Sequence, residues 1–322
     1  MALLEVEDLT VRFRTLRGEV YAVNGVDLSV DAGETVAVVG ESGSGKSVTA
    51  LAILGLLGPA ASVPRGRVEF DGQPLLGRSE HQLRRLRGAA ISMIFQDPMT
   101  CLNPMMPIGA QVAEVLEAHT KLRRADIRRR AIEVLDEVGI PDAARRADHY
   151  PHQFSGGMRQ RAMIAIAIAC TPRLLIADEP TTALDVTVQA QILDLLRRLI
   201  ADHRMGLLLI THDLGVVADT CGVTNVMYGG RVVESASTRE LFRRPTHPYT
   251  VALLRSIPTL QVDRKARLDS IEGQPPVLRA APVGCTFAAR CPRVLERCRT
   301  DTPRLEEHGE QHLAACWNPV TQ

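Results

Sequence analysis

The first 35 residues alternate apolar and polar positions, as in Glu5-Val6-Glu7 and in residues 26–30 (VDLSV). A period of two is typical of half-buried strands, so this region predicts antiparallel strands. Residues 35–40 (TVAVVG) instead form a nearly continuous apolar run, and two similar runs follow at residues 174–177 (LLIA) and 207–210 (LLLI). Such runs are typical of strands buried on both faces of a sheet.

Helical patterns separate these runs. Within residues 188–203, apolar side chains recur at the i, i+3, i+4, i+7 spacing of one helix face. Buried strands that alternate with helices indicate a parallel, helix-flanked sheet, so the expected fold class is α/β. The pattern from about residue 98 to residue 160 is mostly helix and turn, which predicts a helical insertion into the sheet domain.

The composition of the chain changes after about residue 245, where prolines become frequent, apolar runs shorten and cysteines gather. We therefore expect one large domain over residues 1–260 and a small C-terminal extension over residues 261–322. His308 and His312 lie near the cysteines of this extension and are expected on the surface rather than as metal ligands.

Membrane and nucleic-acid signals are weak. No stretch approaches the ~20 consecutive apolar residues of a membrane helix, and the N-terminus does not resemble a secretory signal. We therefore expect a cytoplasmic protein that reaches a membrane only through a partner. The 38 basic and 37 acidic residues balance, which argues against nucleic acid as the main partner.

Residues 40–47 (GESGSGKS) fit the phosphate-binding pattern G-x-x-x-x-G-K-[ST]. The motif follows the predicted strand at 35–40 and precedes an apolar helix, which is the context that it requires. Glycines let backbone N–H groups wrap phosphates, and the helix N-terminus adds a positive dipole end. We expect Lys46 to reach the β- and γ-phosphates of ATP and the Ser47 hydroxyl to bind Mg²⁺. The nucleotide-binding set is Gly40, Ser42, Gly43, Ser44, Gly45, Lys46 and Ser47.

Two acids, Asp178 and Glu179, end the apolar strand that begins at residue 174. A strand that emerges beside a phosphate loop can deliver one carboxylate to the metal and the next to the attacking water. Asp178 suits the Mg²⁺ role and Glu179 the water-polarising role. The alternative is a pair of solvated acids at a strand end.

Further motifs give the chain a family resemblance. Residues 154–161 (FSGGMRQR) resemble the signature motif of ATP-binding-cassette (ABC) ATPases, although Phe154 stands where Leu is commoner. Gln96 resembles the family's Q-loop glutamine, residues 183–185 (ALD) its D-loop, and His212 its switch histidine. The match runs in the family's order over roughly residues 3–255, and Ser235 also departs from the commoner glycine.

The resemblance implies an ABC nucleotide-binding domain with an antiparallel β-subdomain and a helical subdomain. It implies that Phe13 stacks on adenine, that Gln96 contacts Mg²⁺, and that Gln96, Glu179 and His212 are catalytic. It also implies a head-to-tail dimer with a second cassette. There the signature loop, together with the D-loop, closes over ATP held by the partner; these residues are Ser155, Gly156, Gly157 and Asp185.

Longer strings at residues 149–161, 178–189 and 245–250 resemble the oligopeptide/dipeptide/nickel permease branch. This resemblance implies a homologous second ATPase subunit, two transmembrane permease subunits and an extracytoplasmic solute-binding protein. The chain would then be peripheral to the cytoplasmic face of the cell membrane and power the import of di- or oligopeptides. The alternatives are a nickel importer, a soluble non-transport ABC ATPase, and a non-hydrolysing regulatory subunit, which the intact Glu179 and His212 argue against.

The segment from Gln96 to Ile108 contains three prolines and two adjacent methionines but few charges. A partly apolar, turn-rich surface suits the docking of a cytoplasmic helix of a membrane subunit, so we expect a permease contact here. The alternative is an ordinary loop packed on its own domain.

Four cysteines in the extension have the spacing C-x₅-C-x₆-C-x₁₇-C, at Cys285, Cys291, Cys298 and Cys316. Three explanations of this group remain: packed thiols, a structural zinc site and an iron–sulfur cluster. The absence of a C-x₂-C pair makes the zinc site the weaker of the two metal alternatives. Pro292 predicts a helix that runs to Cys298. Cysteines seven apart on one helix are separated by about 10.5 Å of rise, which suits a cubane better than one ion. Resemblance to permease ATPases with a four-cysteine tail implies a [4Fe–4S] cluster.

Overall fold

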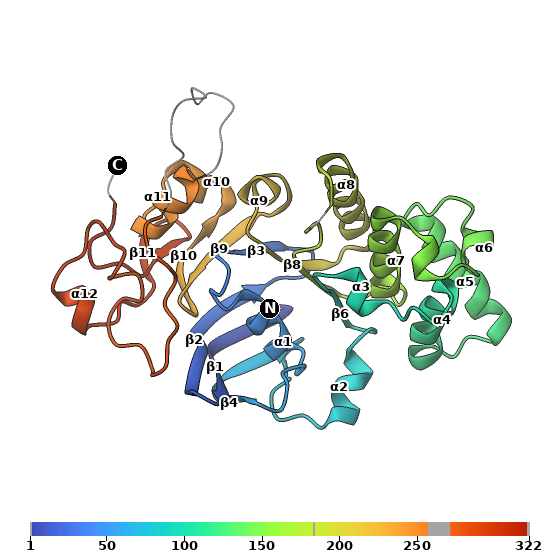
Figure 1. Cartoon of the computed structure of the whole chain (residues 1–322), viewed down its shortest axis with the longest axis horizontal. Coiled ribbons are helices and arrows are strands. Elements are labelled where there is room, and N and C mark those ends of the chain that lie inside the picture. The colour runs from blue at the N-terminus through green and yellow to red at the C-terminus, as the bar shows by residue number, and fades with distance from the viewer. Residues whose placement is uncertain (1, 183, 257–270, 321–322) are drawn as a thin grey trace. The chain divides into compact units, whose positions relative to one another are not determined.

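The structure is a computed structural model that describes residues 2–182, 184–256 and 271–320 (Figure 1). The chain divides into two compact units. The first comprises Met1–Leu3, Val30–Glu34 and Gly77–Leu209, and the second comprises Leu4–Ser29, Thr35–Leu76 and Ile210–Gln322. The expected boundary between residues 260 and 261 lies outside the described residues.

An antiparallel sheet opens the second unit. Its strands are β1 (Leu4–Thr15), β2 (Gly18–Val30), β4 (Ala61–Phe70) and β5 (Gln73–Pro74), in the order β2-β1-β4-β5. β1 and β4 run antiparallel from the Leu4–Phe70 pair onward. Val26, Leu28 and Val30 are buried, whereas the side chains between them are exposed. The predicted alternation of apolar and polar positions is therefore confirmed.

The second unit also holds a mixed sheet in the order β11-β12-β10-β9-β3. β3 (Thr35–Val39) runs parallel to β9 (Val223–Tyr228), and β10 (Arg231–Ser237) is antiparallel to β9. β12 (His312–Ala314) adds to β10, and β11 (Glu306–Gly309) pairs with β12. The helices of this unit are α1 (Lys46–Ile53), α9 (Leu214–Thr220), α10 (Thr238–Arg243), α11 (Pro248–Arg255) and α12 (Arg297–Thr300).

The first unit contains β6 (Ile91–Ile94) and β7 (Leu174–Asp178), which pair in parallel, and most of β8 (Gly206–Thr211) beside β7. β6, β7 and β8 are buried almost throughout, as strands covered on both faces are. The parallel strands and their flanking helices confirm the predicted α/β class.

Between residues 98 and 160 the described elements are all helices, and Figure 1 shows the helices from α4 (Ile108–His119) to α7 (Gly156–Ile168) grouped together. In α8 (Val186–His203), Ile192, Leu195, Leu196 and Leu199 are buried, as their spacing predicted. The helices of this unit are α2 (Glu80–Leu86), α3 (Pro98–Cys101), α4 (Ile108–His119), α5 (Arg124–Glu137), α6 (Ala143–Arg146), the 3-10 turn η1 (Pro151–Gln153), α7 (Gly156–Ile168) and α8 (Val186–His203).

Two expectations for the C-terminal segment were wrong. The predicted helix from Pro292 to Cys298 does not form, because α12 covers only Arg297–Thr300. Backbone N–H groups there bond to cysteine sulfurs instead of to a helical ladder, as in the 3.4 Å contact from Leu295 N to Cys298 Sγ. His312 was expected on the surface, yet it is 5% exposed and its Nε2 lies 2.7 Å from the buried carboxylate of Glu234.

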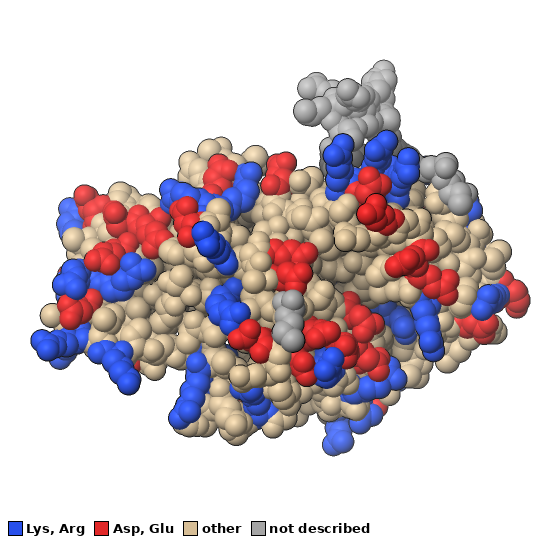
Figure 2. All heavy atoms as spheres, turned by 180° about the vertical axis from the view of Figure 1, so that it is seen from behind, with Lys and Arg blue, Asp and Glu red and all other residues tan. Residues whose placement is uncertain are grey.

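Basic and acidic side chains are interspersed over the face of the molecule shown in Figure 2. Several form exposed ion pairs, such as Arg67 with Glu7 and Arg128 with Asp148. Pairs of this kind contribute little stability individually. Within the described ranges, no helix is both long and apolar enough to cross a bilayer.

Candidate functional site

The loop between β3 and α1 has a backbone that only glycine tolerates at two positions. Gly40 and Gly45 have φ angles of 150° and 104°, and a Cβ on either would lie 2.1 Å and 2.4 Å from the carbonyl oxygens of Met227 and Ala22. Any larger residue would push the loop away from these carbonyls. The glycines therefore fix a tight turn that leads directly into the N-terminus of α1.

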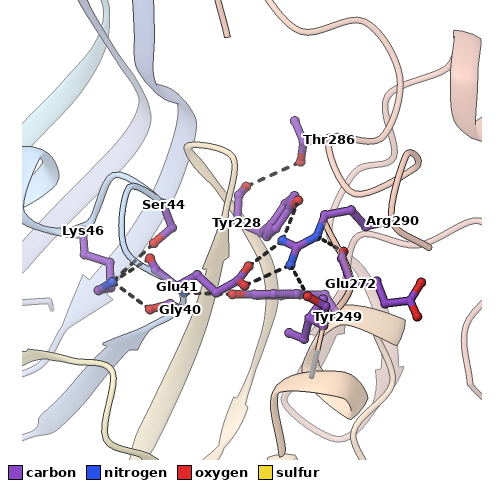
Figure 3. A network of polar contacts seen from close by, with 10 residues as sticks. Gly40, Glu41, Ser44, Lys46, Tyr228, Tyr249, Glu272, Thr286 and Arg290 are labelled. Atoms are coloured by element: carbon purple, nitrogen blue, oxygen red, sulfur yellow. Dashed lines mark hydrogen bonds and ion pairs between the residues drawn. The ribbon is translucent and has the colours of Figure 1, made fainter. Parts of the chain in front are cut away.

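Lys46, the first residue of α1, is 6% exposed and folds back over the loop. Its Nζ donates to Gly40 O at 2.8 Å, Glu41 O at 3.0 Å and Ser44 Oγ at 3.5 Å (Figure 3). Ser42 and Gly43 are exposed at the tip of the loop. An ammonium group, exposed backbone at the tip and a helix N-terminus are features that favour an anion, so this loop is a candidate phosphate site.

In the first unit, the end of β7 carries the two acids that the sequence singled out. Asp178 is 5% exposed, and Glu179 follows it with a φ of 46°. Glu179 Oε2 accepts hydrogen bonds from Gln96 Nε2 at 2.9 Å and from Thr182 Oγ1 at 2.8 Å. A left-handed backbone is uncommon for a glutamate, and such residues concentrate at functional sites.

Ser155 caps the N-terminus of α7, where its Oγ accepts a hydrogen bond from Met158 N at 3.4 Å. Ser155 and Gly156 are exposed, so this helix end presents its backbone N–H groups outward. A Cβ on Gly157 would lie only 2.8 Å from Val188 Cγ1. Because glycine has no Cβ, α7 can approach α8 closely here. A helix N-terminus favours negative charge, so the exposed end of α7 is a second candidate anion site.

Sequence reasoning missed the role of Gln160. This residue is 2% exposed, and its Nε2 donates to Pro180 O at 2.5 Å. The contact links α7 to the turn that carries Glu179. Only its place inside the signature string could have drawn attention to it.

The remaining candidate residues lie at the ends of elements. Asp185 caps α8, with its Oδ1 accepting from Val188 N at 2.9 Å, while Ala183 lies outside the described residues. His212 is exposed just after β8, and Phe13 is half-buried on β1. The candidate residues thus form two sets, one in each unit. The first unit holds Gln96, Ser155, Gly156, Gly157, Asp178, Glu179 and Asp185, and the second holds Phe13, residues 40–47 and His212.

The four C-terminal cysteines are all free thiols and all belong to the second unit. Each sulfur accepts a backbone N–H bond: Cys291 from Arg293, Cys298 from Leu295, Cys316 from Asn318, and Cys285 from Phe287 and Ala288. Hydrogen bonds of this kind stabilise negative charge on sulfur.

Burial raises the pKa of the Cys316 thiol to about 11, partly offset by the backbone N–H of Asn318. The other three cysteines lie close enough to raise this pKa further, and burial also raises the pKa of Cys285 and Cys291. In the part of the chain that the structure describes, no three His, Cys, Asp or Glu side chains gather tightly enough to hold a metal ion. The four sulfurs therefore lie near one another but do not form a compact metal site within the described residues.

Comparison with protein families gives two matches. Residues 23–182 match the family described as ABC transporter, and residues 233–298 match the C-terminal region of oligopeptide/dipeptide transporters. Together these two ranges contain the phosphate loop, the strand-end acids and three of the four C-terminal cysteines.

The chain is 53% identical to a probable peptide ABC transporter ATP-binding protein of Sinorhizobium fredii, over 98% of this chain and 94% of that protein. It is 49% identical to the oligopeptide transport ATP-binding protein OppD of Escherichia coli, over 100% of this chain and 94% of that protein. A dimeric ATP-binding cassette, solved in a post-hydrolysis state with ADP and Pi, matches with a TM-score of 0.66 and 28% identity. That match covers 73% of this chain and 99% of the solved one.

Proposed function

Since the chain belongs to the ABC transporter ATPases of the oligopeptide/dipeptide branch and is the ATP-hydrolysing subunit of a peptide importer, we propose which of its residues do this work. The observation that carries the proposal is the strand end at which Gln96 donates a hydrogen bond to Glu179, in a chain whose other unit has a glycine-dependent phosphate loop around Lys46.

Residues 40–47 bind the phosphates of ATP, with Lys46 at the β- and γ-phosphates and Phe13 against the adenine. Ser47, Gln96 and Asp178 are the oxygen donors for Mg²⁺, whose contribution is to neutralise charge on the phosphates. Oxygen ligands of this kind suit a hard cation, and Asp178 is buried at the strand end as a metal carboxylate usually is.

Glu179 orients the attacking water and takes up its proton, because its carboxylate is held at one oxygen by both Gln96 and Thr182. His212 contacts the terminal phosphate from its exposed position after β8. Gln96 is both a proposed metal ligand and a hydrogen-bond donor to the proposed base, so it is suited to couple nucleotide binding to the conformation of its own loop.

The assembly is a head-to-tail dimer with a homologous cassette. The N-terminus of α7 is exposed at Ser155 and Gly156, and a helix N-terminus suits the phosphates of ATP held by the partner. A dimeric cassette among the structural relatives supports this arrangement. Asp185, at the start of α8, joins the signature loop in closing over the ATP that the partner holds.

The segment before α4 is the docking surface for a permease subunit on the cytoplasmic side of the membrane. Met105 is 82% exposed there. The Gln111 side chain fixes the shape of this loop, since its Oε1 accepts from Asn103 N at 2.9 Å and its Nε2 donates to Asn103 O at 3.0 Å and Met106 O at 2.9 Å. A rigid loop that exposes an apolar side chain suits a partner helix.

The four C-terminal cysteines hold a [4Fe–4S] cluster that ties the C-terminal segment into a fixed shape. Four neighbouring sulfurs, each with an N–H donor, fit this group chemically. The sequence has no C-x₂-C pair among these four cysteines, which favours a cluster over zinc. Because the thiols have raised pKa values, binding must displace their protons.

The transported solute is a di- or oligopeptide, since the two relatives are a probable peptide transporter subunit and an oligopeptide transport subunit. The test is uptake of labelled peptide by cells that lack this chain, with the gene restored as wild type or as Lys46→Ala. We expect wild type, and not Lys46→Ala, to restore peptide uptake. Restoration of nickel uptake without peptide uptake would assign the chain to the nickel importers of the same branch.

A further inference from the structure

Glu41, the second residue of the phosphate loop, is held at three points by groups of the second unit (Figure 3). Its carboxylate forms a two-pronged ion pair with Arg290, with Nη1–Oε2 at 2.7 Å and Nη2–Oε1 at 3.0 Å. Its backbone N–H donates to Tyr249 Oη at 2.9 Å, and its carbonyl accepts from Lys46 Nζ at 3.0 Å. The side chain, N–H and C=O of one loop residue are therefore all fixed.

Arg290 is held in place independently of Glu41. Its side chain is 6% exposed, and it donates to two backbone carbonyls, Glu272 O at 2.8 Å and Ile271 O at 3.0 Å. It also donates to Tyr228 Oη at 3.2 Å. Hydrogen bonding to Glu41 raises the pKa of Arg290, so the guanidinium stays charged. A planar fork with five donors can make all of these contacts, whereas a lysine cannot.

The segment that carries Arg290 is anchored by an aromatic cluster. Phe287 is 1% exposed, and its ring lies 5.1 Å from Tyr228 and 5.3 Å from Tyr249, measured between ring centroids. Tyr228 and Tyr249 are themselves 4.6 Å apart. Buried aromatic clusters pack firmly, so Arg290 reaches the loop from a rigid base.

We propose that Arg290 is a positioning residue for ATP binding, acting through Glu41. By fixing Glu41, it keeps the carbonyls of Gly40 and Glu41 where they hold Lys46, and it keeps the loop in its phosphate-binding shape. The C-terminal segment is then part of the nucleotide site without touching the nucleotide. The inference rests on the proposed role of residues 40–47 as the ATP site.

The test compares ATP hydrolysis by purified transporter complexes that carry wild-type or Arg290→Gln chains. Loss of a buried charge-assisted pair should raise the KM for ATP about tenfold, with a smaller change in kcat. Arg290→Lys should not rescue the KM, because lysine cannot make the two-pronged contact. The matched control is Arg297→Gln, which removes an exposed pair with Asp301 in the same segment and should leave the KM unchanged.

A second variant keeps the proposal testable if Arg290→Gln does not fold. Glu41→Gln breaks the same ion pair from the loop side and should raise the KM by a similar factor. If folded Arg290→Gln or Glu41→Gln has a lower melting temperature but a wild-type KM for ATP, the ion pair only stabilises the fold and the proposal is wrong. Lys46→Ala tests the ATP site separately: normal ATP binding by that variant would overturn the proposed site itself, whatever the result at Arg290.

Discussion

The amide of Gln96 donates a hydrogen bond to the carboxylate of Glu179 over 2.9 Å, although 83 residues separate them in the chain. Gln96 lies two residues after β6 and Glu179 directly after β7, and these two strands are parallel neighbours. Parallel strands end at the same edge of a sheet, which brings the two side chains together. This orientation suits the proposed role of Glu179 as the base that acts on water.

Replacing Glu179 by Gln should preserve ATP binding and reduce kcat by about two to four orders of magnitude, because an amide cannot take up the proton of the water. Steady-state hydrolysis and equilibrium binding of a labelled nucleotide would measure the two effects. Thr182→Val should lower kcat much less than Glu179→Gln, since it removes one of the two hydrogen bonds to Glu179 Oε2 but keeps the carboxylate that takes up the proton. Wild-type hydrolysis by Glu179→Gln would show that the base is another group.

A cysteine introduced at Met105 should crosslink to a co-expressed permease subunit, because this side chain is 82% exposed on a loop that Gln111 holds rigid. The background requires Cys101→Ser, since Cys101 is exposed nearby. Leu122→Cys serves as the control, as Leu122 is another exposed apolar side chain of the same unit, 44% exposed. Equal crosslinking from both positions, or crosslinking from Leu122 alone, would rule out the proposed docking surface.

Anaerobic purification should yield a brown protein with about four irons per chain, one for each cysteine ligand. Cys298→Ser should lose most of the iron, whereas Cys221→Ser should retain it, because Cys221 is a buried thiol outside this group. A colourless preparation that contains one zinc would replace the cluster with a zinc site. Metal-free protein with four reactive thiols would mean that the cysteines are simply packed.

His247 should make folding sensitive to acid. It is 1% exposed, burial lowers its pKa to about 4, and its Nδ1 accepts a hydrogen bond from Tyr249 N at 3.1 Å, which requires that nitrogen to be unprotonated. Below about pH 6.5 the unfolded chain binds a proton here that the folded chain does not. The stabilisation is therefore complete above that pH and is lost as the pH falls toward 4.

Between pH 7 and pH 5 this difference amounts to about 2 kcal/mol of unfolding free energy. Denaturant unfolding at both values should therefore give a weaker pH dependence for His247→Gln than for wild type. His308→Gln, at an exposed histidine, should keep the wild-type dependence. An identical pH dependence for wild type and His247→Gln would contradict the proposed neutral imidazole.

Much of the nucleotide site follows from the sequence because its determinants are local. The loop at residues 40–47 needs glycine at Gly40 and Gly45 for its φ angles, and such needs are visible as residue types at fixed spacing. The strands at 35–39 and 174–178 are likewise apparent from their apolar runs. Local backbone requirements restrict residue types at fixed positions, and burial sets the spacing of apolar residues, so both can be recognised in a single sequence.

The C-terminal segment could not be predicted in this way. Pro292 indicated a helix through Cys298, but N–H bonds to the cysteine sulfurs at Cys291 and Cys298 compete with the helical ladder, so only the short α12 forms. His312 was expected on the surface because its buried partner, Glu234, lies 78 residues away. A single sequence does not record such distant pairings.

The sequence by itself therefore determined the fold class, the phosphate loop and the two strand-end acids, since each depends on neighbours along the chain. Only the tertiary structure decided that Gln96 holds Glu179 and that Arg290 holds Glu41 across 249 residues of sequence. An arginine pairs with whichever carboxylate the packing brings within reach. Near Arg290 this packing is the mutual contact of Phe287 with two tyrosines of the second unit, and nothing in the local sequence around Arg290 or Glu41 encodes it.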